Sequence, residues 1–192
     1  FGTNEVKFST GGTQRATVDS SGRLLVGTTS ARDHLNDGSD STHIALEGTT
    51  QDTTTLSIVR NSNNDGPAHL VLGKSRGGSA NSTTVVQDGD TIGHINFEAA
   101  DGSHLIRAGQ ISCIVDGTPG ANDMPGRLSF KTCPDGSNSL SERMRIKNTG
   151  QTIVYSTTSD GVLNLHSSKS ASESHNALVV QHSATSVTTG TA

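Results

Sequence analysis

Few residues of this sequence stand at a spacing typical of a catalytic, phosphate-binding or metal-binding site. The run Gly73-Lys74-Ser75 ends like a phosphate-binding loop, but that motif needs a glycine five residues before Gly73, where Ala68 stands. No helical pattern follows the run, and a phosphate site of this kind depends on the N-terminus of that helix. We therefore interpret residues 74–78 as a surface loop.

Two pairs of acidic residues invite comparison with the acid pair of a polysaccharide-cleaving enzyme. Glu98 and Asp101 flank a turn, whereas Asp116 and Asp123 share one loop. The chain has one Tyr and no Trp, so neither pair has an aromatic platform for a sugar ring. We expect these acids to form turns and predict no catalytic residue. A calcium site in residues 116–123 remains an alternative, although the loop lacks the dense acidic spacing of known calcium loops.

Histidine and cysteine give no metal pattern. No His-x-His pair occurs, and no Cys or carboxylate lies at zinc spacing beside a histidine. A three-fold axis would still allow one histidine from each of three chains to meet. Cys113 and Cys133 are too few for a disulfide framework, and we expect Cys113 to be a buried free thiol. We predict no metal or cofactor site. The histidines are His34, His43, His69, His94, His104, His166, His175 and His182.

The composition limits how this chain can fold. Hydrophobic residues make up 30% of the chain and aromatic residues 3%. Even with the 22 glycines added, the apolar share is below the roughly 45–50% of an ordinary globular domain. Such a chain has little apolar surface to offset its conformational entropy. It is therefore either disordered or folded by burying apolar side chains against copies of itself.

The charge and the hydropathy of the chain argue against nucleic acid and membrane as binding partners. The chain carries 14 Lys and Arg against 18 Asp and Glu, a net charge of -4, with no basic run. This argues against nucleic-acid binding. No apolar stretch reaches the roughly 18 residues of a membrane-spanning helix. We expect no membrane insertion.

Turn residues and strand-like alternation dominate the sequence. Asp-Gly suits the positive-φ positions of tight turns and occurs seven times, beginning at Asp37, Asp65, Asp88, Asp101, Asp116, Asp135 and Asp160. Between the turns, apolar and polar residues alternate with a period of two, which is typical of half-buried antiparallel strands. We predict an all-β fold of short antiparallel strands and hairpins. The alternation is clear at Ile44 and Leu46, Ile95 and Phe97, Leu128 and Phe130, and Met144 and Ile146.

A repeat divides the chain. Residues 14–30 and 142–159 both read as strand, polar turn with glycine, strand and Thr-Thr-Ser, and Gly22 matches Gly150 at an offset of 150 − 22 = 128 residues. Repeated units of this kind favour an elongated array. We predict the end of a preceding hairpin module at residues 1–30, one complete β-rich module at residues 31–159, and the start of a following module at residues 160–192. We expect both ends of the sequence to continue in a longer chain.

The central loop carries a resemblance to a known family. Residues 115–127 (VDGTPGANDMPGR), with 128–132 (LSFKT), 134–136 (PDG) and 142–146 (ERMRI), resemble a recurrent module of phage tail-fibre proteins. That module is common in phages of marine bacteria and cyanobacteria and in prophages. The resemblance covers about residues 12–160 and is most specific in the central loop. Further similar segments are residues 22–30, 46–61, 73–76 and 93–102.

This resemblance implies an elongated, intertwined homotrimeric fibre. Such fibres often end in a self-cleaving intramolecular chaperone domain, which would lie beyond Ala192. The role implied is structural and adhesive, not enzymatic, in a virion that becomes extracellular after release. The implied partners are two further copies of the chain, other tail or baseplate proteins, and a glycan or protein of the host cell surface. No catalytic residue is carried over.

In such a trimer, we expect apolar strand positions of three chains to meet in a shared or adjoining core. Loops 61–67 and 74–82 would be available to a receptor. One alternative is a tailspike-type depolymerase, which predicts acids clustered beside aromatic residues. Another is a bacterial surface filament or adhesin, which predicts a signal peptide or sortase-type tail in the full-length chain. The expected core positions are Ile95, Phe97, Ile111, Val115, Leu128, Phe130, Met144 and Ile146.

Overall fold

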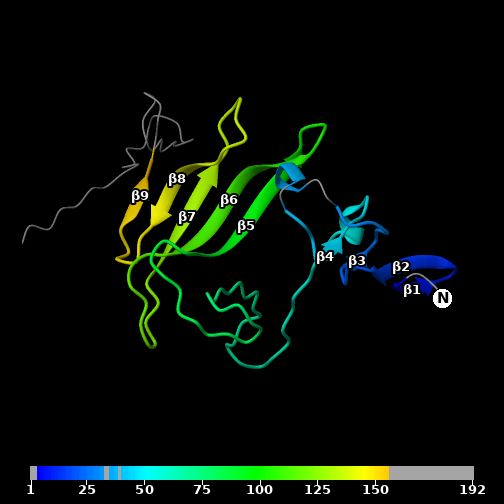
Figure 1. Cartoon of the computed structure of the whole chain (residues 1–192), viewed down its shortest axis with the longest axis horizontal. Coiled ribbons are helices and arrows are strands. Elements are labelled where there is room, and N and C mark those ends of the chain that lie inside the picture. Colours follow the sequence, from blue (N-terminus) through cyan, green and yellow to red (C-terminus); the bar gives the residue numbers. More distant parts are fainter. Residues whose placement is uncertain (1–3, 33–34, 39, 156–192) are drawn as a thin grey trace, which may run out of the picture. The chain divides into compact units, whose positions relative to one another are not determined.

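The computed structural model describes residues 4–32, 35–38 and 40–155. Over these ranges the regular elements are β-strands and two short 3-10 helices, with no α-helix. No helix in this described part is long and apolar enough to span a membrane. The strands form two sheets (Figure 1). The predicted all-β fold is confirmed, while the predicted start of a following module at residues 160–192 lies outside the described residues.

The first sheet has the strand order β1-β2-β3-β4. β1 (Val6–Thr10), β2 (Thr13–Val18) and β3 (Leu24–Val26) are antiparallel neighbours. β4 (Ile44–Leu46) pairs with β3 in parallel, after a crossover that contains the 3-10 helix η1 (Asn36–Gly38). The alternation at residues 44–46 therefore predicted a strand correctly, but it did not predict a parallel partner.

The second sheet is a meander with the order β5-β6-β7-β8-β9. Its first four strands pair antiparallel, and β5 and β6 are the longest. Asp101-Gly102 turns the chain between β5 and β6, and Asp135-Gly136 lies between β7 and β8, as the Asp-Gly pattern predicts. Both glycines have positive φ. The strands are β5 (Thr91–Ala100), β6 (Leu105–Val115), β7 (Gly126–Thr132), β8 (Ser141–Ile146) and β9 (Thr152–Val154).

One face of the second sheet is apolar, and we call it the apolar face. Directly paired residues of neighbouring strands form rows across it, as the alternation predicts. The side chain of Phe97 on this face is 56% exposed, and Ile95 and Leu128 are also exposed. Cys113, expected to be buried, is only half-buried here. The rows are Ile95, Ile111, Phe130 and Met144, and Gly93, Cys113, Leu128 and Ile146.

The opposite face is polar and bonded within itself. Gln110 Nε2 donates to Asn96 Oδ1 at 2.8 Å, Ser112 Oγ donates to Gln110 Oε1 at 2.9 Å, and His94 Nδ1 lies 3.0 Å from Ser112 Oγ. Ser112 is 0% exposed. Burial lowers the pKa of His94, as do the nearby charges of Lys131 and Arg107, so the ring is neutral at pH 7. These four side chains of the polar face thus bond to one another within one chain.

The hydrophobic core of the described chain is very small. Its buried hydrophobic side chains are Leu25, Val86, Ile114 and Val115, whereas eighteen large hydrophobic side chains are exposed. Val115, expected in a core shared between chains, is already 0% exposed within its own chain. Most of the apolar surface is thus left without cover, which is unusual for a soluble monomer.

Two hairpins of the chain have the same local structure. β2 and β3 have the same bounds as β8 and β9 once 128 residues are added to each position. In the first hairpin, Gly22 N donates to Asp19 O and Asp19 N donates to Arg23 O. In the second, Gly150 N and Lys147 N make the corresponding bonds. The similarity seen in the sequence is therefore a similarity of backbone, while the division into modules stays a prediction.

Replacement of Gly22 or Gly150 by alanine tests these turns. Both glycines have positive φ, 76° and 80°, and open space where a Cβ would lie. We expect each substitution to lower the free energy of unfolding by about 1–2 kcal/mol, because a Cβ is strained in the left-handed region. Gly78→Ala is the control, since its Cβ also meets open space but its φ is not positive. Urea unfolding at one fixed protein concentration measures the difference, and equal effects at all three sites would contradict the turn geometry.

Candidate functional site: two loops held by one turn

A short turn at residues 87–90, the connecting turn, precedes β5 and reaches the end of β6. Asp90 N donates to Gln87 O at 3.0 Å, which closes the turn. Gly89 N donates to Val115 O at 3.0 Å, and Val115 N donates to Asp90 O at 2.8 Å. The turn is thereby fixed to the last residue of β6, from which a loop leaves the sheet.

That loop, residues 116–125, runs from β6 to β7 and projects beyond the sheet; we call it the projecting loop (Figure 1). Gly120 and Asp123 exchange two backbone hydrogen bonds of 2.9 and 3.1 Å near its tip. Asn122, between them, has a positive φ of 56°, a conformation that asparagine tolerates better than most residues. Its tip, including Met124, is exposed.

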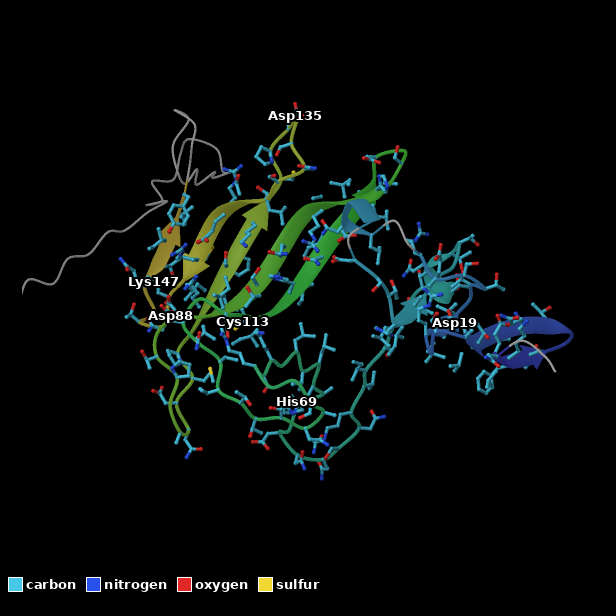
Figure 2. The ribbon with its side chains drawn as sticks, in the orientation of Figure 1. Asp19, His69, Asp88, Cys113, Asp135 and Lys147 are labelled. Carbon is cyan, nitrogen blue, oxygen red and sulfur yellow. The ribbon has the colours of Figure 1, made fainter. Side chains whose placement is uncertain are left out.

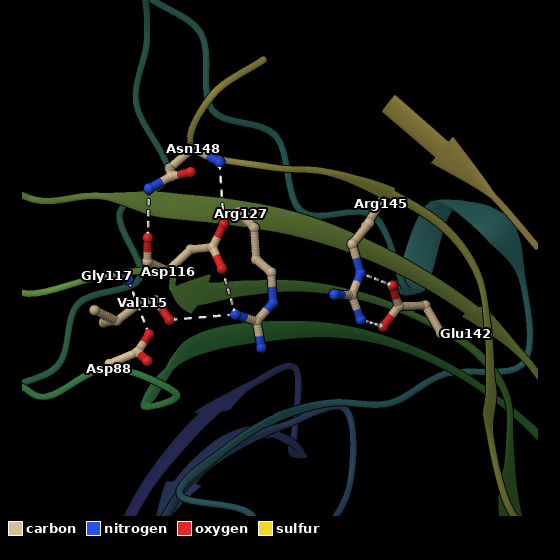
Figure 3. A network of polar contacts seen from close by, with 8 residues as sticks. All are labelled: Asp88, Val115, Asp116, Gly117, Arg127, Glu142, Arg145 and Asn148. Carbon is tan, nitrogen blue, oxygen red and sulfur yellow. Dashed lines mark hydrogen bonds and ion pairs between the residues drawn. The ribbon is translucent and has the colours of Figure 1, made fainter. Parts of the chain in front are cut away.

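Asp116 holds the base of the projecting loop (Figure 3). Its carboxylate accepts from Arg127 Nη1 at 2.8 Å and from the backbone N–H of Asn148 at 3.1 Å. Asn148 Nδ2 also donates to Asp116 O at 2.6 Å. The next residue, Gly117, donates its N–H to Asp88 Oδ1 of the connecting turn at 2.8 Å. The loop is therefore fixed to β7, to the turn after β8 and to the connecting turn.

Residues 74–84 form a second loop, the closed loop. Its ends meet where Arg76 N donates to Thr84 O at 3.2 Å. The Arg76 guanidinium donates two bonds, of 2.6 and 2.7 Å, to the carboxylate of Asp90. A bidentate pair of this kind fixes orientation as well as distance. Asp88 and Asp90, two residues apart in the connecting turn, thus hold the two loops.

The two loops border one hollow of about 560 Å³. Hydroxyl groups and one cation dominate the part of its lining that comes from the closed loop. The projecting loop adds small and apolar groups. Ser82 Oγ lies within hydrogen-bond distance of the hydroxyls of Ser75 and Thr84, and Val85 and Val86 add apolar surface, so the lining is mixed in character. It offers no acid pair and no aromatic platform. The lining includes Lys74, Ser75, Ser82, Thr83, Thr84, Ala121 and Met124.

The carboxylates that hold the loops are stabilised in their charged form. The Asn148 N–H and the Arg127 guanidinium lower the pKa of Asp116 below its ordinary value. The Arg76 guanidinium and the Gln87 N–H lower the pKa of Asp90 strongly. Both carboxylates are therefore ionised throughout the neutral range, and their bonds do not depend on small changes of pH.

The acidic residues that the sequence suggested as pairs have different surroundings in the structure. Asp101 accepts from the backbone N–H groups of Ser103 and His104, at 2.7 and 2.8 Å, as a turn former does. Glu98 lies 3.4 Å from the Arg107 guanidinium. The Asp116 carboxylate is bonded as described above, and Asp123 lies at the exposed loop tip.

The remaining candidate residues do not gather either. In residues 4–32, 35–38 and 40–155, no group of three or more His, Cys, Asp or Glu side chains could hold a metal ion. Cys113 and Cys133 are free thiols. Ser75, in the phosphate-loop-like run, bonds to Ser82 and to Thr84 O, and no helix follows it.

Of the two loops expected to meet a receptor, only one borders the hollow. Residues 74–82 lie in the closed loop, whereas residues 61–67 are exposed but line no part of it. The sequence did not reveal the roles of Asp88, Asp90 and Asn148. Asp88 was visible only as an Asp-Gly turn, and the contact between Asp116 and Asn148 spans 32 positions of the chain.

Comparison with known proteins gives a fold. No protein-family model and no curated protein sequence matches this chain. The carboxy-terminal domain of the bacteriophage T5 L-shaped tail fibre is similar, with a TM-score of 0.54 at 18% identity, over 84% of this chain and 66% of that chain. The fold is that of a phage tail-fibre domain. The same T5 fibre domain with its intra-molecular chaperone domain matches with a TM-score of 0.59 at 15% identity.

The second match covers 88% of this chain but only 47% of the T5 chain. This chain therefore spans between about half and two thirds of the T5 chains to which it is similar. The tail-fibre fold implied by the resemblance is confirmed. Assembly and host attachment do not follow from the fold alone.

Replacement of Asp116 by alanine tests the base of the projecting loop. The change removes the acceptor of Arg127 and of the Asn148 N–H, so we expect amide hydrogens of residues 115–126 and 147–150 to exchange at least tenfold faster. Asp123→Ala is the matched control, because it removes a carboxylate of the same loop at its exposed tip. Equal exchange in the two variants would contradict the role of Asp116.

The same carboxylates predict a dependence of stability on pH. The folded-state pKa of Asp116 and of Asp90 is lowered, so their contribution is complete above the unfolded-state pKa of about 3.9. It is lost as pH falls from there through the folded-state pKa. Urea unfolding between pH 7 and pH 2.5 should therefore show a decline below about pH 4, smaller in Asp116→Asn. An unchanged decline in that variant would exclude Asp116 as a cause.

Proposed function

We propose that this chain is a non-enzymatic segment of a bacteriophage tail fibre that forms a homotrimer and contributes to host-surface attachment. The observation that carries this proposal is the likeness to the T5 tail-fibre domain over 84% of the chain. In this role the protein is part of the virion, becomes extracellular on release, and contacts other tail or baseplate proteins. The resemblance of residues 115–127 to tail-fibre modules supports the same role.

The exposed apolar surface supports assembly with other copies. Of the positions expected in a shared core, Ile95, Phe97 and Leu128 are exposed in the single chain. Uncharged apolar surface of this kind is typical of the core of an interface between permanent partners. Three copies that bury these side chains together would supply the hydrophobic stabilisation that one chain lacks.

The hollow between the two loops supports contact with a host surface. Its loops are fixed by Asp88, Asp90 and Asp116, so a ligand would not have to order them first. Its hydroxyl groups and Lys74 suit a polar ligand, such as a host glycan or a polar protein segment. Loops on a rigid scaffold commonly carry recognition. Glu98, Asp101 and Asp116 each have a local bonding role, which agrees with a non-enzymatic reading.

Assembly is tested by placing a charge on the apolar face. Phe97→Asp puts a carboxylate where the proposed trimer excludes water, so we expect the trimer to dissociate at a protein concentration at least tenfold higher than in the wild type. Asn96→Asp is the matched control, because it adds the same charge one residue away on the polar face and keeps the oxygen that accepts from Gln110. Sedimentation equilibrium measures both.

A wild-type chain that sediments as a stable, folded monomer would overturn the trimer. Release of soluble sugar from purified capsule or lipopolysaccharide would overturn the non-enzymatic role and favour the depolymerase. Circular dichroism of the Phe97→Asp chain shows whether its strands persist. We expect them to persist at concentrations at which the variant is still assembled, because Phe97 is more than half exposed within one chain and does not hold the sheet together.

A further inference from the structure

A long part of the chain has no regular structure. From the end of η2 (Gln51–Thr53) to the start of β5, no residue lies in a helix or a strand (Figure 1). Connections longer than roughly 12–15 residues are uncommon in folded domains and are usually either functional or linker segments. Within this part, residues 55–73, which include His69 (Figure 2), form no backbone–backbone hydrogen bond. We call residues 55–73 the exchange segment.

The exchange segment nevertheless has the sequence of two strands. Residues 55–60 read TLSIVR and residues 68–73 read AHLVLG, and an Asp-Gly-Pro turn stands between them. β-Branched and long aliphatic residues of this kind favour strands. An isolated chain would therefore be expected to pair these runs with a sheet or with each other, and it does neither.

Apolar side chains of the exchange segment point to solvent. Leu56 is 75% exposed and Val71 is 79% exposed. The segment has only two charged side chains: Arg60 ends the first run, Asp65 lies between the runs, and the second run has no charged side chain. Exposed apolar runs with unpaired backbone groups are surfaces on which another chain can pack or pair. The other exposed aliphatic residues are Ile58, Val59, Leu70 and Leu72.

The apolar face of the second sheet has the matching character. Leu72 already lies against it, because a Cβ on Gly93 would come within 2.8 Å of the Leu72 Cβ. Around this contact is a hollow of about 170 Å³ with an almost entirely apolar lining. Within one chain, apolar side chains of both surfaces remain exposed, among them Val71 of the segment and Phe97 of the face. The lining includes Leu72, Ile95, Ile111, Cys113 and Leu128.

We infer that the exchange segment is shared between copies: in the assembled protein, the two apolar runs of each chain pack against the apolar face of a neighbouring chain. This inference rests on the proposed homotrimer and names the surfaces that meet in it. Each chain carries both surfaces, and both are mainly apolar, with Arg60 at the end of the first run as the charged residue of the two runs. If each of three copies packs its segment on the apolar face of the next copy, every segment and every apolar face has a partner. Such an arrangement closes into a ring.

The experiment places a photoreactive benzoylphenylalanine at the position of Val71. Unlabelled and ¹⁵N-labelled preparations of the variant chain are assembled together. Mass spectrometry then separates links between chains from links within one chain. After irradiation of the assembled protein, we expect covalent dimers whose linked peptides come from β5 to β7 and include Ile95, Phe97 or Leu128. The same group at Ser62, an exposed polar residue between the two apolar runs, is the matched control.

Each outcome decides between the occupants of the apolar face. Links from position 71 that occur only within one chain would overturn the exchange, and so would covalent dimers that form as often from position 62. If the protein is still a trimer by sedimentation, the proposed function stays intact. A monomer by sedimentation would overturn both. As a second measure, Val71→Asp should raise the protein concentration at which the trimer dissociates at least tenfold, whereas Ser62→Asp should not. Equal dissociation of the two variants would contradict the exchange.

Discussion

The polar face of the second sheet carries side chains that bond to one another within one chain, whereas apolar side chains on its other face are left exposed. On the polar face, Asn96, Gln110, Ser112 and His94 bond to one another. On the apolar face, the rows that the strands align remain half-covered. Hydrogen bonds between strands fix the shape of the sheet, but burial of apolar surface supplies most of the driving force for folding. The architecture of this chain therefore depends on where that apolar surface is buried.

This constraint explains why regular structure and core are distributed so unevenly. The strands that pair within the chain lie in two sheets. In the sequence, a segment with a strand-like pattern stands between the strands of the first sheet and those of the second, and it does not pair. A compact monomer would place such a segment over its own sheet. Here Leu72 lies against the sheet while Leu56, Ile58, Val59, Leu70 and Val71 stay exposed, and the loops of residues 74–84 and 116–125 are instead fixed by carboxylates, which require no hydrophobic core.

Much of the fold could be predicted from local pattern. The alternation of Ile95 with Phe97, and of Met144 with Ile146, predicted strands and their faces, because side-chain direction in a strand depends only on neighbouring residues. Asp101-Gly102 and Asp135-Gly136 predicted turns for the same reason. By contrast, the parallel pairing of β3 with β4 depends on residues far apart, and nothing local distinguishes a parallel partner from an antiparallel one.

The site was predictable only in part. Residues 74–82 were expected in an exposed loop, and the structure places them beside a hollow. The roles of Asp88, Asp90 and Asn148 depend on bonds between segments that the sequence does not show to be close. The turn at Asp65-Gly66 was predicted as well, but its flanking runs do not form a hairpin. A strand pattern indicates that a segment can pair, and it does not identify the chain that provides the partner.

The two matching hairpins bear on how the length of such a protein can vary. β2 with β3, and β8 with β9, begin and end at equivalent residues and close with the same backbone bonds. The stretch between them therefore starts and finishes on the same local backbone. A recombination event that duplicated or deleted that stretch would join equivalent residues of the two hairpins. The gene could thus gain or lose one copy of that stretch in a single step, without a new junction having to evolve.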